Sequence, residues 1–528
     1  MNAVAFTAPH KVAASIGYAM LEQGASAIDA MIAAAAAITV VYPHMNSLGG
    51  DGFWLIHRKG RPPIAIDACG TAAMLANLDF YRHESAIPSR GGKAALTMAG
   101  TLDGWRCARE FAASMDTTPF TLAELLEPAI RLAEQGITVT NSLQTASEKV
   151  AESMQNLNGY QSVFCPSGRT LRAGETFCNP GLGRFMRKLS VNGLSDFYRG
   201  ELAMEMAQWL ELAGSPLRLA DFATYQAKVV EPLQLAIKGA TLYNLPPPTQ
   251  GLASLLILAL YDRVHQHHKP TSEAADIHLL VECCKQAFLV RDRVVTDPSR
   301  LAPDWLETFS AEKLDQMAAA ITSAASPWPR TANPGDTVWM GALDSKGCMV
   351  SFIQSVYWEF GSGLVHPDYG VHWNNRGLSF SLDPANLNAL KPGCKPFHTL
   401  NPAFAIFDDG RRLSYGTMGG EGQPQTQAAV FSRYHYRQQS LQSAISRGRW
   451  LLGRTWGDSS HDLKLEADLA NDIGADLHAR GHQFRTVPAH SEMMGHAGAI
   501  ALYPDGTAEA ATDPRSDGAA FARSTQRE

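Results

Sequence analysis

The amino-acid sequence predicts an α/β protein arranged as a four-layer αββα sandwich. Strand-like runs lie near the start of the chain and again beyond residue 337, whereas residues 80–330 have mostly helical patterns. Neither a low-complexity linker nor a fixed-period repeat divides the 528 residues. Strands from both ends of the chain, with helices between them, fit two stacked sheets covered by helices on both outer faces. We therefore expect one structural domain, although length alone would suggest about three.

Two helices are expected first. Helical periodicity covers residues 11–23 and ends near Gly24, and Ser26 is the expected N-cap of a helix over residues 27–40. The second helix carries an alanine run that suits close packing inside a layered fold, and Pro43 ends it. The strands expected next are residues 53–57 and 64–67.

The second half of the chain changes from helix to strand. A rigid, proline-rich loop at residues 246–251 precedes an apolar helix over residues 252–261. The strands predicted beyond it are residues 337–343, 349–357, 371–373, 403–407 and 413–416. Helical patterns return at residues 425–437 and 464–480, and Asp-Gly turns at residues 408–410 and 504–506 indicate hairpins.

Thr337 is the first residue of a predicted β-hairpin. The polar, Gly-ended turn at residues 344–347 joins its two strands, and a loop rich in Pro, Ser, Ala and Gly precedes it at residues 323–335. Threonine favours strands, so a structural role is the simplest interpretation of this residue taken alone.

Composition is that of a globular protein, with 45% hydrophobic and 18% charged residues. The net charge of −6 gives no bulk basic bias toward nucleic acid or an anionic membrane, so neither is an expected partner. The first ten residues lack a basic head followed by an apolar run, and the most apolar segment, residues 30–42, is shorter than the ~20 residues that span a bilayer. We expect a cytoplasmic protein.

The sequence gives no sign of a metal or another cofactor. Its eight cysteines are scattered without a Cys-x-x-Cys pair, which favours reduced thiols over a disulfide framework or a zinc site. The histidine-rich tract at residues 265–268 is better explained as a solvated helix end. No His-Glu-x-x-His motif is present.

A set of short motifs runs through nearly the whole chain in a specific order. Its members are residues 27–53, which end in Gly-Gly-Asp-Gly-Phe, then Ile66-Asp67, the loop at 246–251, the strand opening at Thr337, Asn374-Asn375, Lys395-Pro396 and residues 416–420. Together they resemble the γ-glutamyltransferase family of N-terminal nucleophile hydrolases. Each motif is weak alone, but their order makes the set specific.

The resemblance implies a proenzyme that cuts itself between Asp336 and Thr337. The products would be a large subunit of residues 1–336 and a small subunit of residues 337–528. Because strands from both pieces are needed to complete the sheets, we expect a tight heterodimer of the two fragments, which could in turn pair into a dimer.

Cleavage would make Thr337 a nucleophile. It would acquire a free α-amine, with an unperturbed pKa of ~7.7–8, which can act as base for its own hydroxyl. The hydroxyl would attack an amide carbonyl and form an acyl-enzyme. The resemblance implies that Gly419 and Gly420 donate backbone N–H groups to the oxyanion and that Ser355 contacts the nucleophile. Alone, the glycines would suggest a simple turn, and Ser355 a residue on a strand face.

The chain departs from the family where γ-glutamyl enzymes hold the glutamate. Cys69 stands about where they have an arginine, and no acid follows Asn375. Tyr357 replaces an asparagine, and His398-Thr399 replace a serine pair. These changes argue against glutathione as the substrate.

The replacements suggest a smaller substrate. Arg376 adds a cation with bidentate geometry for a carboxylate, and Tyr357, Trp358 and Trp373 would close the pocket if they face it. Asn375, His398 and Thr399 are the other expected substrate contacts. A structural ion pair remains the alternative for Arg376, and capping of a strand for His398.

We predict an amidohydrolase that acts on a small, carboxylate-bearing amide. The pattern resembles a cytoplasmic branch of the family, for which oxamate, split to oxalate and ammonia, is the first candidate substrate. The alternatives are a γ-glutamyltransferase or glutathione hydrolase, a cephalosporin-type acylase, and, from another class, a non-catalytic binding protein with the same fold.

Overall fold

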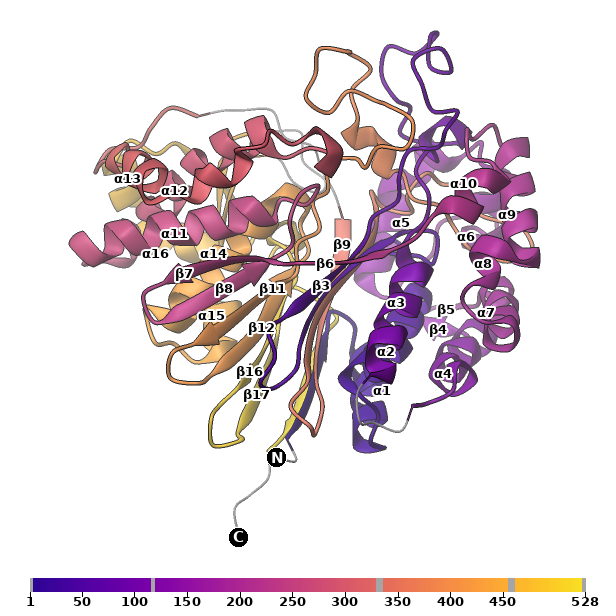
Figure 1. The fold of residues 1–528 in the computed structure, drawn as a ribbon, viewed down its shortest axis with the longest axis horizontal. Helices are drawn as coiled ribbons and strands as arrows, with labels where there is room; N and C mark the ends of the chain where they lie inside the picture. Colours follow the sequence, from indigo (N-terminus) through magenta and orange to yellow (C-terminus); the bar gives the residue numbers. More distant parts are fainter. Residues whose placement is uncertain (1–2, 115–118, 329–335, 454–460, 525–528) are drawn as a thin grey trace.

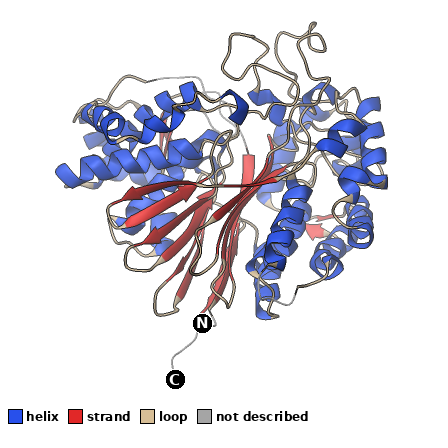
Figure 2. Ribbon diagram, viewed as in Figure 1, coloured by secondary structure: helices blue, strands red, loops and turns tan. Residues whose placement is uncertain are grey.

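The computed structural model describes residues 3–114, 119–328, 336–453 and 461–524. Two β-sheets face each other in the middle, and helices cover the outer face of each (Figures 1 and 2). The predicted αββα sandwich is therefore confirmed. The loop expected at residues 323–335 lies largely outside the described residues.

The first sheet is antiparallel throughout and has seven strands. In spatial order these are β18 (Ala519–Arg523), β1 (Val4–Ala8), β9 (Asp336–Leu343), β10 (Met349–Tyr357), β2 (Asp51–His57), β3 (Ile64–Ala68) and β6 (Lys228–Val230).

The second sheet is also antiparallel and has six strands. In spatial order these are β17 (Ala508–Thr512), β16 (Ala497–Leu502), β12 (Arg412–Thr417), β11 (Ala403–Phe407), β8 (Ala240–Asn244) and β7 (Leu233–Ile237). Both sheets draw strands from before and after residue 336, as the interleaved-fragment prediction requires.

Helices from different parts of the chain cover the two sheets (Figure 1). On the side of the first sheet lie α1 (Lys11–Glu22), α2 (Ala27–Val41), α3 (Thr101–Ala113), α4 (Leu122–Gln135), α5 (Asn141–Met154), α6 (Asn158–Phe164), α7 (Pro180–Asn192), α8 (Asp196–Arg199), α9 (Glu201–Leu212) and α10 (Leu219–Thr224). On the side of the second lie α11 (Gly251–His267), α12 (Glu273–Val294), α13 (Ala311–Ala319), α14 (Gln423–His435), α15 (Leu441–Ser446) and α16 (Ala467–Ala479).

The remaining elements are short. They are the sheet of β13 (Trp450–Leu452), β14 (Leu463–Glu466) and β15 (Phe484–Val487), the pair β4 (Ile137–Thr138) and β5 (Thr176–Phe177), and the 3-10 turns η1 (Gly92–Ala94), η2 (Pro298–Arg300), η3 (Trp305–Phe309), η4 (Arg376–Ser379), η5 (Gly420–Gly422) and η6 (Glu492–Met494).

Several local predictions are confirmed. The Ser26 hydroxyl accepts a hydrogen bond from the Asp29 amide at the start of α2. The β9–β10 hairpin forms with the expected turn, in which Gly347 donates to Asp344. Hairpins also form at both Asp-Gly turns, between β11 and β12 and between β16 and β17.

Residues 80–330 are mostly helical, as predicted, although the region also contains β6, β7 and β8, two of which complete the second sheet. Two element predictions are wrong. Residues 371–373 form no strand, because His372 and Trp373 make only isolated bridges, to Val365 and Gly49. The helix predicted over residues 464–480 begins only at Ala467, because β14 takes the residues before it.

Strand β9 alternates between two cores, as a strand buried on both faces must. Val338 and Met340 pack among the helices that cover the first sheet, whereas Trp339 and Leu343 pack between the two sheets. This alternation fixes which way each residue of β9 faces.

Trp339 is seated among glycines. A Cβ atom at Gly416 would lie 2.2 Å from its ring, and one at Gly498 would lie 2.5 Å away. The indole N–H donates to the Ser351 hydroxyl at 2.9 Å. Gly416 on β12 and Gly498 on β16 have no side chain, and this leaves room for the indole of Trp339, two residues after Thr337.

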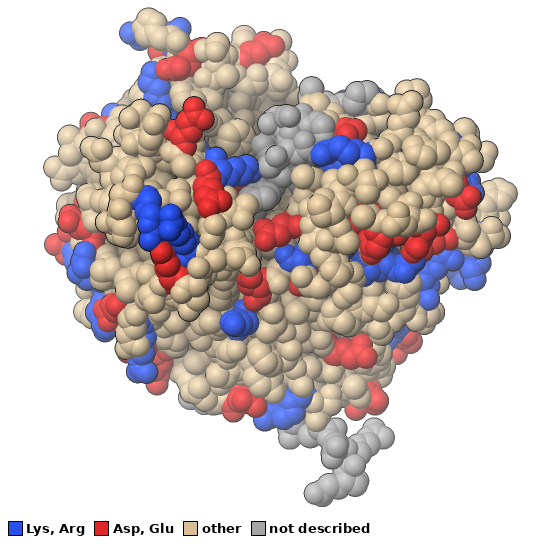
Figure 3. All heavy atoms as spheres, turned by 180° about the vertical axis from the view of Figure 1, so that it is seen from behind, with Lys and Arg blue, Asp and Glu red and all other residues tan. Residues whose placement is uncertain are grey.

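The surface opposite to the view of Figure 1 carries acidic and basic side chains interspersed with one another (Figure 3). Among the described residues, no helix combines the length and apolar character that crossing a bilayer requires.

We predict that Gly416→Ala lowers the free energy of unfolding by about 1–3 kcal/mol, because the new methyl group would overlap Trp339. Denaturant unfolding measures the change. Gly52→Ala is the matched control, since the nearest atom to its Cβ would be at the ring edge of Phe352, 3.2 Å away, against 2.2 Å for Gly416. Equal destabilisation by both variants would contradict this account of the indole.

Candidate active site

Thr337 lies buried near the start of β9, in the middle of the first sheet. The pairing of β9 with β10 is regular up to Val338 and Gln354, and then shifts so that Asp336 pairs with Tyr357. Ser355 therefore sits in a bulge at the level of Thr337, where a bulge can re-aim side chains.

The two glycines lie between β12 and α14. Gly419 has a φ of 121° and Gly420 a φ of 53°, which favour glycine at both positions. Gln423, the first residue of α14, donates from Nε2 to Thr337 Oγ1 over 3.4 Å and accepts from the Asn401 amide. Gln423, which directly follows the glycine turn, thus links this turn to Thr337.

Arg376 is almost completely buried in η4. Its Nη1 donates to Thr399 Oγ1 at 3.1 Å, and its guanidinium lies 3.8 Å from the centre of the Tyr357 ring. Its Nε and Nη2 atoms have no hydrogen-bond partner within the part of the chain that the structure describes. These two atoms form one edge of the guanidinium, which suits bidentate binding of a carboxylate.

Tyr357 adopts a backbone conformation that is rare outside glycine, with a φ of 83°. Its amide donates to the Ser355 hydroxyl at 2.8 Å, and its ring supports Arg376. Burial raises the pKa of the phenol, so it stays protonated at neutral pH. Backbone strain of about 1–3 kcal/mol, as such conformations cost, is concentrated where the site residues meet.

Asp51 and His398 form a buried pair beside Arg376. The Leu400 amide donates to His398 Nδ1, so the ring proton is on Nε2, which donates to Asp51 Oδ2 at 3.0 Å. Burial, followed by the charges of Arg376 and Lys395, lowers the pKa of His398 well below its usual range. Burial raises the pKa of Asp51 to about 7, although Arg376 opposes this shift.

Two groups of side chains are close enough to share a metal ion: Asp51, Cys69 and His398, and His278, Glu282 and His482. Burial raises the pKa of the Cys69 thiol well above its usual range, which disfavours the thiolate that a metal needs. In the second group, Lys285 Nζ lies 2.6 Å from Glu282 and already supplies the positive charge. We assign a metal to neither group.

Of the other residues expected near the substrate, some lie at the site and others hold the surrounding chain in place. Asn375 accepts from the Trp358 amide and donates to the Ser89 carbonyl, so its carboxamide links the residue before Arg376 to two distant segments. Trp358 is half-buried beside Tyr357. Trp373 does not meet the condition for closing the pocket, because its indole donates to the Thr97 carbonyl and packs in the core under the helices.

Gln250 was missed as a site residue, although its loop belonged to the recognised motifs. Its fully buried Nε2 donates to the carbonyls of Thr399 and Gly420, both at 2.8 Å. Its Oε1 accepts from Arg291, which also pairs with Glu421 at 2.7 Å. One carboxamide thus links the Arg376 side of the site to the glycine turn. No local sequence pattern could have revealed a link between three such distant segments.

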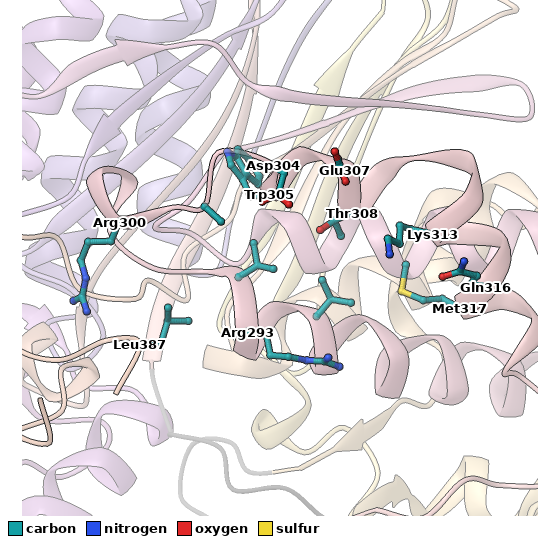
Figure 4. A pocket seen from close by; sticks show the side chains of 13 residues that line it. Arg293, Arg300, Asp304, Trp305, Glu307, Thr308, Lys313, Gln316, Met317 and Leu387 are labelled. Atoms are coloured by element: carbon teal, nitrogen blue, oxygen red, sulfur yellow. The ribbon is translucent and has the colours of Figure 1, made fainter. Parts of the chain in front are cut away.

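A cleft of about 400 Å³ borders these segments and is lined by residues that include Arg291, Ser379, Phe397 and Glu421. A larger pocket of about 550 Å³ lies over the end of α12, η3 and α13 (Figure 4). No predicted site residue lines either pocket, but the smaller cleft is lined by chain neighbours of three of them, since Ser379 follows Arg376 in η4, Phe397 precedes His398 and Glu421 follows Gly420.

A threonine that opens a central strand of an αββα sandwich, beside a glycine turn, defines the class of N-terminal nucleophile hydrolases. The gamma-glutamyltranspeptidase family model matches residues 13–523. The chain belongs to the gamma-glutamyltranspeptidase family, which confirms the resemblance inferred from its motifs.

Individual relatives are similar over almost their full length. The chain is 49% identical to an oxamate amidohydrolase proenzyme of Klebsiella pneumoniae, covering 97% of each sequence. It is 35% identical to a glutathione hydrolase-like proenzyme of Bacillus subtilis, again over 97% of each. The crystal structure of a cephalosporin acylase from Bacillus halodurans has a TM-score of 0.88 at 31% identity and covers 98% of this chain and 95% of that one. These relatives are hydrolases.

We predict that Gln250→Leu lowers kcat/KM about 10- to 100-fold, because two backbone carbonyls of the site would lose their donor and shift. Steady-state kinetics measures this effect. Gln425→Leu is the matched control, since that buried carboxamide bonds to the backbone of Leu452, away from Thr399 and Gly420. An equal loss of activity in both variants would show that lost stability alone is responsible.

Proposed function

We propose that this protein is a self-cleaving threonine amidohydrolase that converts oxamate, or a closely related carboxylate-bearing amide, into oxalate and an amine. The observation that carries the proposal is the buried edge of Arg376, whose Nε and Nη2 have no partner among the described residues. A buried cation attracts a carboxylate more strongly than an exposed one does. Similarity to the Klebsiella oxamate amidohydrolase points to the same substrate.

The proposed reaction begins with cleavage between Asp336 and Thr337, which releases the α-amine of Thr337. This amine takes the hydroxyl proton as the oxygen attacks the amide carbonyl. The N–H groups of Gly419 and Gly420 stabilise the oxyanion, and Ser355 and Gln423 position the threonine. The C–N bond then breaks, the amine leaves with a proton, and water hydrolyses the ester to regenerate Thr337.

Arg376 and its surroundings favour a short acyl group. Thr399 and the Tyr357 ring occupy two sides of the guanidinium, and Asp51 and His398 fill the space beside Cys69. In this proposal Arg376 binds the substrate carboxylate, Thr399 and His398 shape its pocket, and Asn375 holds the Arg376 turn. γ-Glutamyl amides and glutaryl amides, the substrates of the alternative activities, would need space for a longer acyl chain.

We further propose that the fragments, residues 1–336 and 337–528, remain a tight heterodimer. Both sheets contain strands from each fragment, so separating them would break strand pairing in both. A cytoplasmic location remains a prediction, supported by eight cysteines that are all unpaired in the structure.

We predict that purified wild-type protein gives two masses under denaturing conditions, from fragments that meet at residues 336 and 337. Thr337→Ala should stay intact, because it lacks the hydroxyl that the cut and the hydrolysis both require. Mass spectrometry decides the point. An uncut wild-type chain that nevertheless hydrolyses oxamate, or a cut Thr337→Ala chain, would refute Thr337 as the nucleophile.

We predict that Arg376→Lys raises the KM for oxamate at least tenfold. Lysine keeps the charge but loses the paired donors, and a hydrogen bond to a charged group contributes about 1.5–3 kcal/mol. Arg433→Lys controls for replacing a buried arginine, because Arg433 donates to backbone carbonyls outside the site. An unchanged KM in Arg376→Lys would support the structural role instead.

A further inference from the structure

We infer that the cleft beside the site binds a substituent on the leaving amine, so that N-substituted oxamates with a polar, uncharged or cationic group are better substrates than oxamate itself. This inference rests on the proposed function. It concerns the amine side of the substrate, which Arg376 and the acyl pocket do not determine.

The cleft adjoins three segments of the site. Ser379 belongs to the same 3-10 turn as Arg376, Phe397 precedes His398, and Glu421 follows Gly420. All three line the cleft, together with Arg291, which bonds to Gln250. The cleft is therefore lined by residues that lie within about one helical turn, along the chain, of Arg376, His398 and Gly420.

The orientation of a bound amide follows from these positions. Its carboxylate would lie against Arg376, which the Tyr357 ring and Thr399 cover on other sides, and its carbonyl oxygen would lie at the glycine turn. The nitrogen must then point in the remaining direction. Glu421, directly after the glycine turn, lines the cleft. In this inference the nitrogen therefore points toward the cleft.

The cleft is far larger than ammonia requires. Its volume of about 400 Å³ falls in the range of small-molecule pockets, ~300–1,000 Å³, whereas a water-sized molecule needs only ~10–15 Å³. A site that released only ammonia would have no use for this space. A substituent of several heavy atoms would fill it and gain binding energy from it.

The lining predicts which substituent would bind. Side chains of Ser379, Asn386 and Asn388 offer hydrogen bonds, whereas the Ser381 hydroxyl already accepts one from the Asp383 amide. The charged residues are one cation, Arg291, and two anions, Asp292 and Glu421, and Arg291 is paired with both. The resulting excess of negative charge favours hydroxyalkyl or aminoalkyl groups and disfavours a second carboxylate on the amine.

The reaction on such a substrate balances without a further reactant. Thr337 Oγ bonds to the amide carbon, and the C–N bond breaks as the amine takes up a proton. Water then cleaves the ester. The N-substituted oxamate monoanion and one water give the oxalate dianion and a protonated amine, with the total charge unchanged.

The test compares kcat/KM for oxamate with that for N-(2-hydroxyethyl)oxamate, N-(2-aminoethyl)oxamate and N-carboxymethyl oxamate. We expect the hydroxyethyl and aminoethyl compounds to exceed oxamate at least tenfold, and the carboxymethyl compound to fall below them. Hydrolysis of oxamate alone, or of oxamate tenfold faster than the others, would overturn the inference and leave the proposed function standing. No hydrolysis of any of the four would overturn both.

A pair of variants tests the cleft directly. Ser381→Trp should fill it and lower the ratio of kcat/KM for the aminoethyl compound to that for oxamate at least tenfold. Ser381→Ala removes the same hydroxyl without adding bulk and should leave the ratio within threefold of wild type. Because the ratio is taken within one protein sample, partial misfolding cannot produce the change. An unchanged ratio in Ser381→Trp would overturn the assignment of the cleft.

Discussion

The packing of Trp339 between the two sheets is the constraint on which the site depends. The indole fills space that glycines leave on β12 and β16, and so it sets the depth and rotation of β9. Because side chains alternate along a strand, fixing Trp339 also fixes the direction of Thr337, two residues earlier and on the same face. Strands β1 and β10 pair with β9 on its two edges, so this strand has little freedom to shift. The proposed nucleophile is thus held by the core rather than by a loop.

Around this fixed point, the polar residues form a buried network with few exposed members. Arg376, Asp51 and His398 are almost fully buried, and the Lys395–Asp67 ion pair, at 2.7 Å, lies next to them. The low effective dielectric constant of this buried region strengthens each polar interaction, and it also makes any buried polar group without a hydrogen-bond partner energetically costly. Arg376 is such a case, because the edge of its guanidinium formed by Nε and Nη2 has no hydrogen-bond partner among the described residues. Its burial is best explained by a ligand that completes it, which connects the energetics of the fold to the substrate proposed.

The sequence predicted best what local patterns determine. The Ser26 cap, the β9–β10 hairpin and the Asp-Gly turns depend on residues close together in the chain, and all formed as expected. Features set by distant contacts were missed: β7 and β8 are strands because β11 accepts them as neighbours, and Trp373 turns toward Thr97 instead of the site. Arg376 shows the same limit. Its sequence motif allowed either an ion pair or a substrate contact, and only the three-dimensional surroundings reveal two donors that lack partners in the described parts of the chain.

Strands β1 and β18, near the two ends of the described chain, lie next to each other because they are adjacent and antiparallel in the first sheet (Figure 1). Val4 pairs with Arg523, so these two residues are about one strand spacing, ~5 Å, apart. A short linker could therefore join β18 to β1, and new termini could be opened between Asp336 and Thr337. Such a circular permutant would be synthesised with Thr337 directly behind the initiator methionine. Removal of that methionine would expose the threonine amine without any peptide-bond cleavage inside the fold. The permutant would therefore have a free Thr337 amine without the proposed self-cleavage.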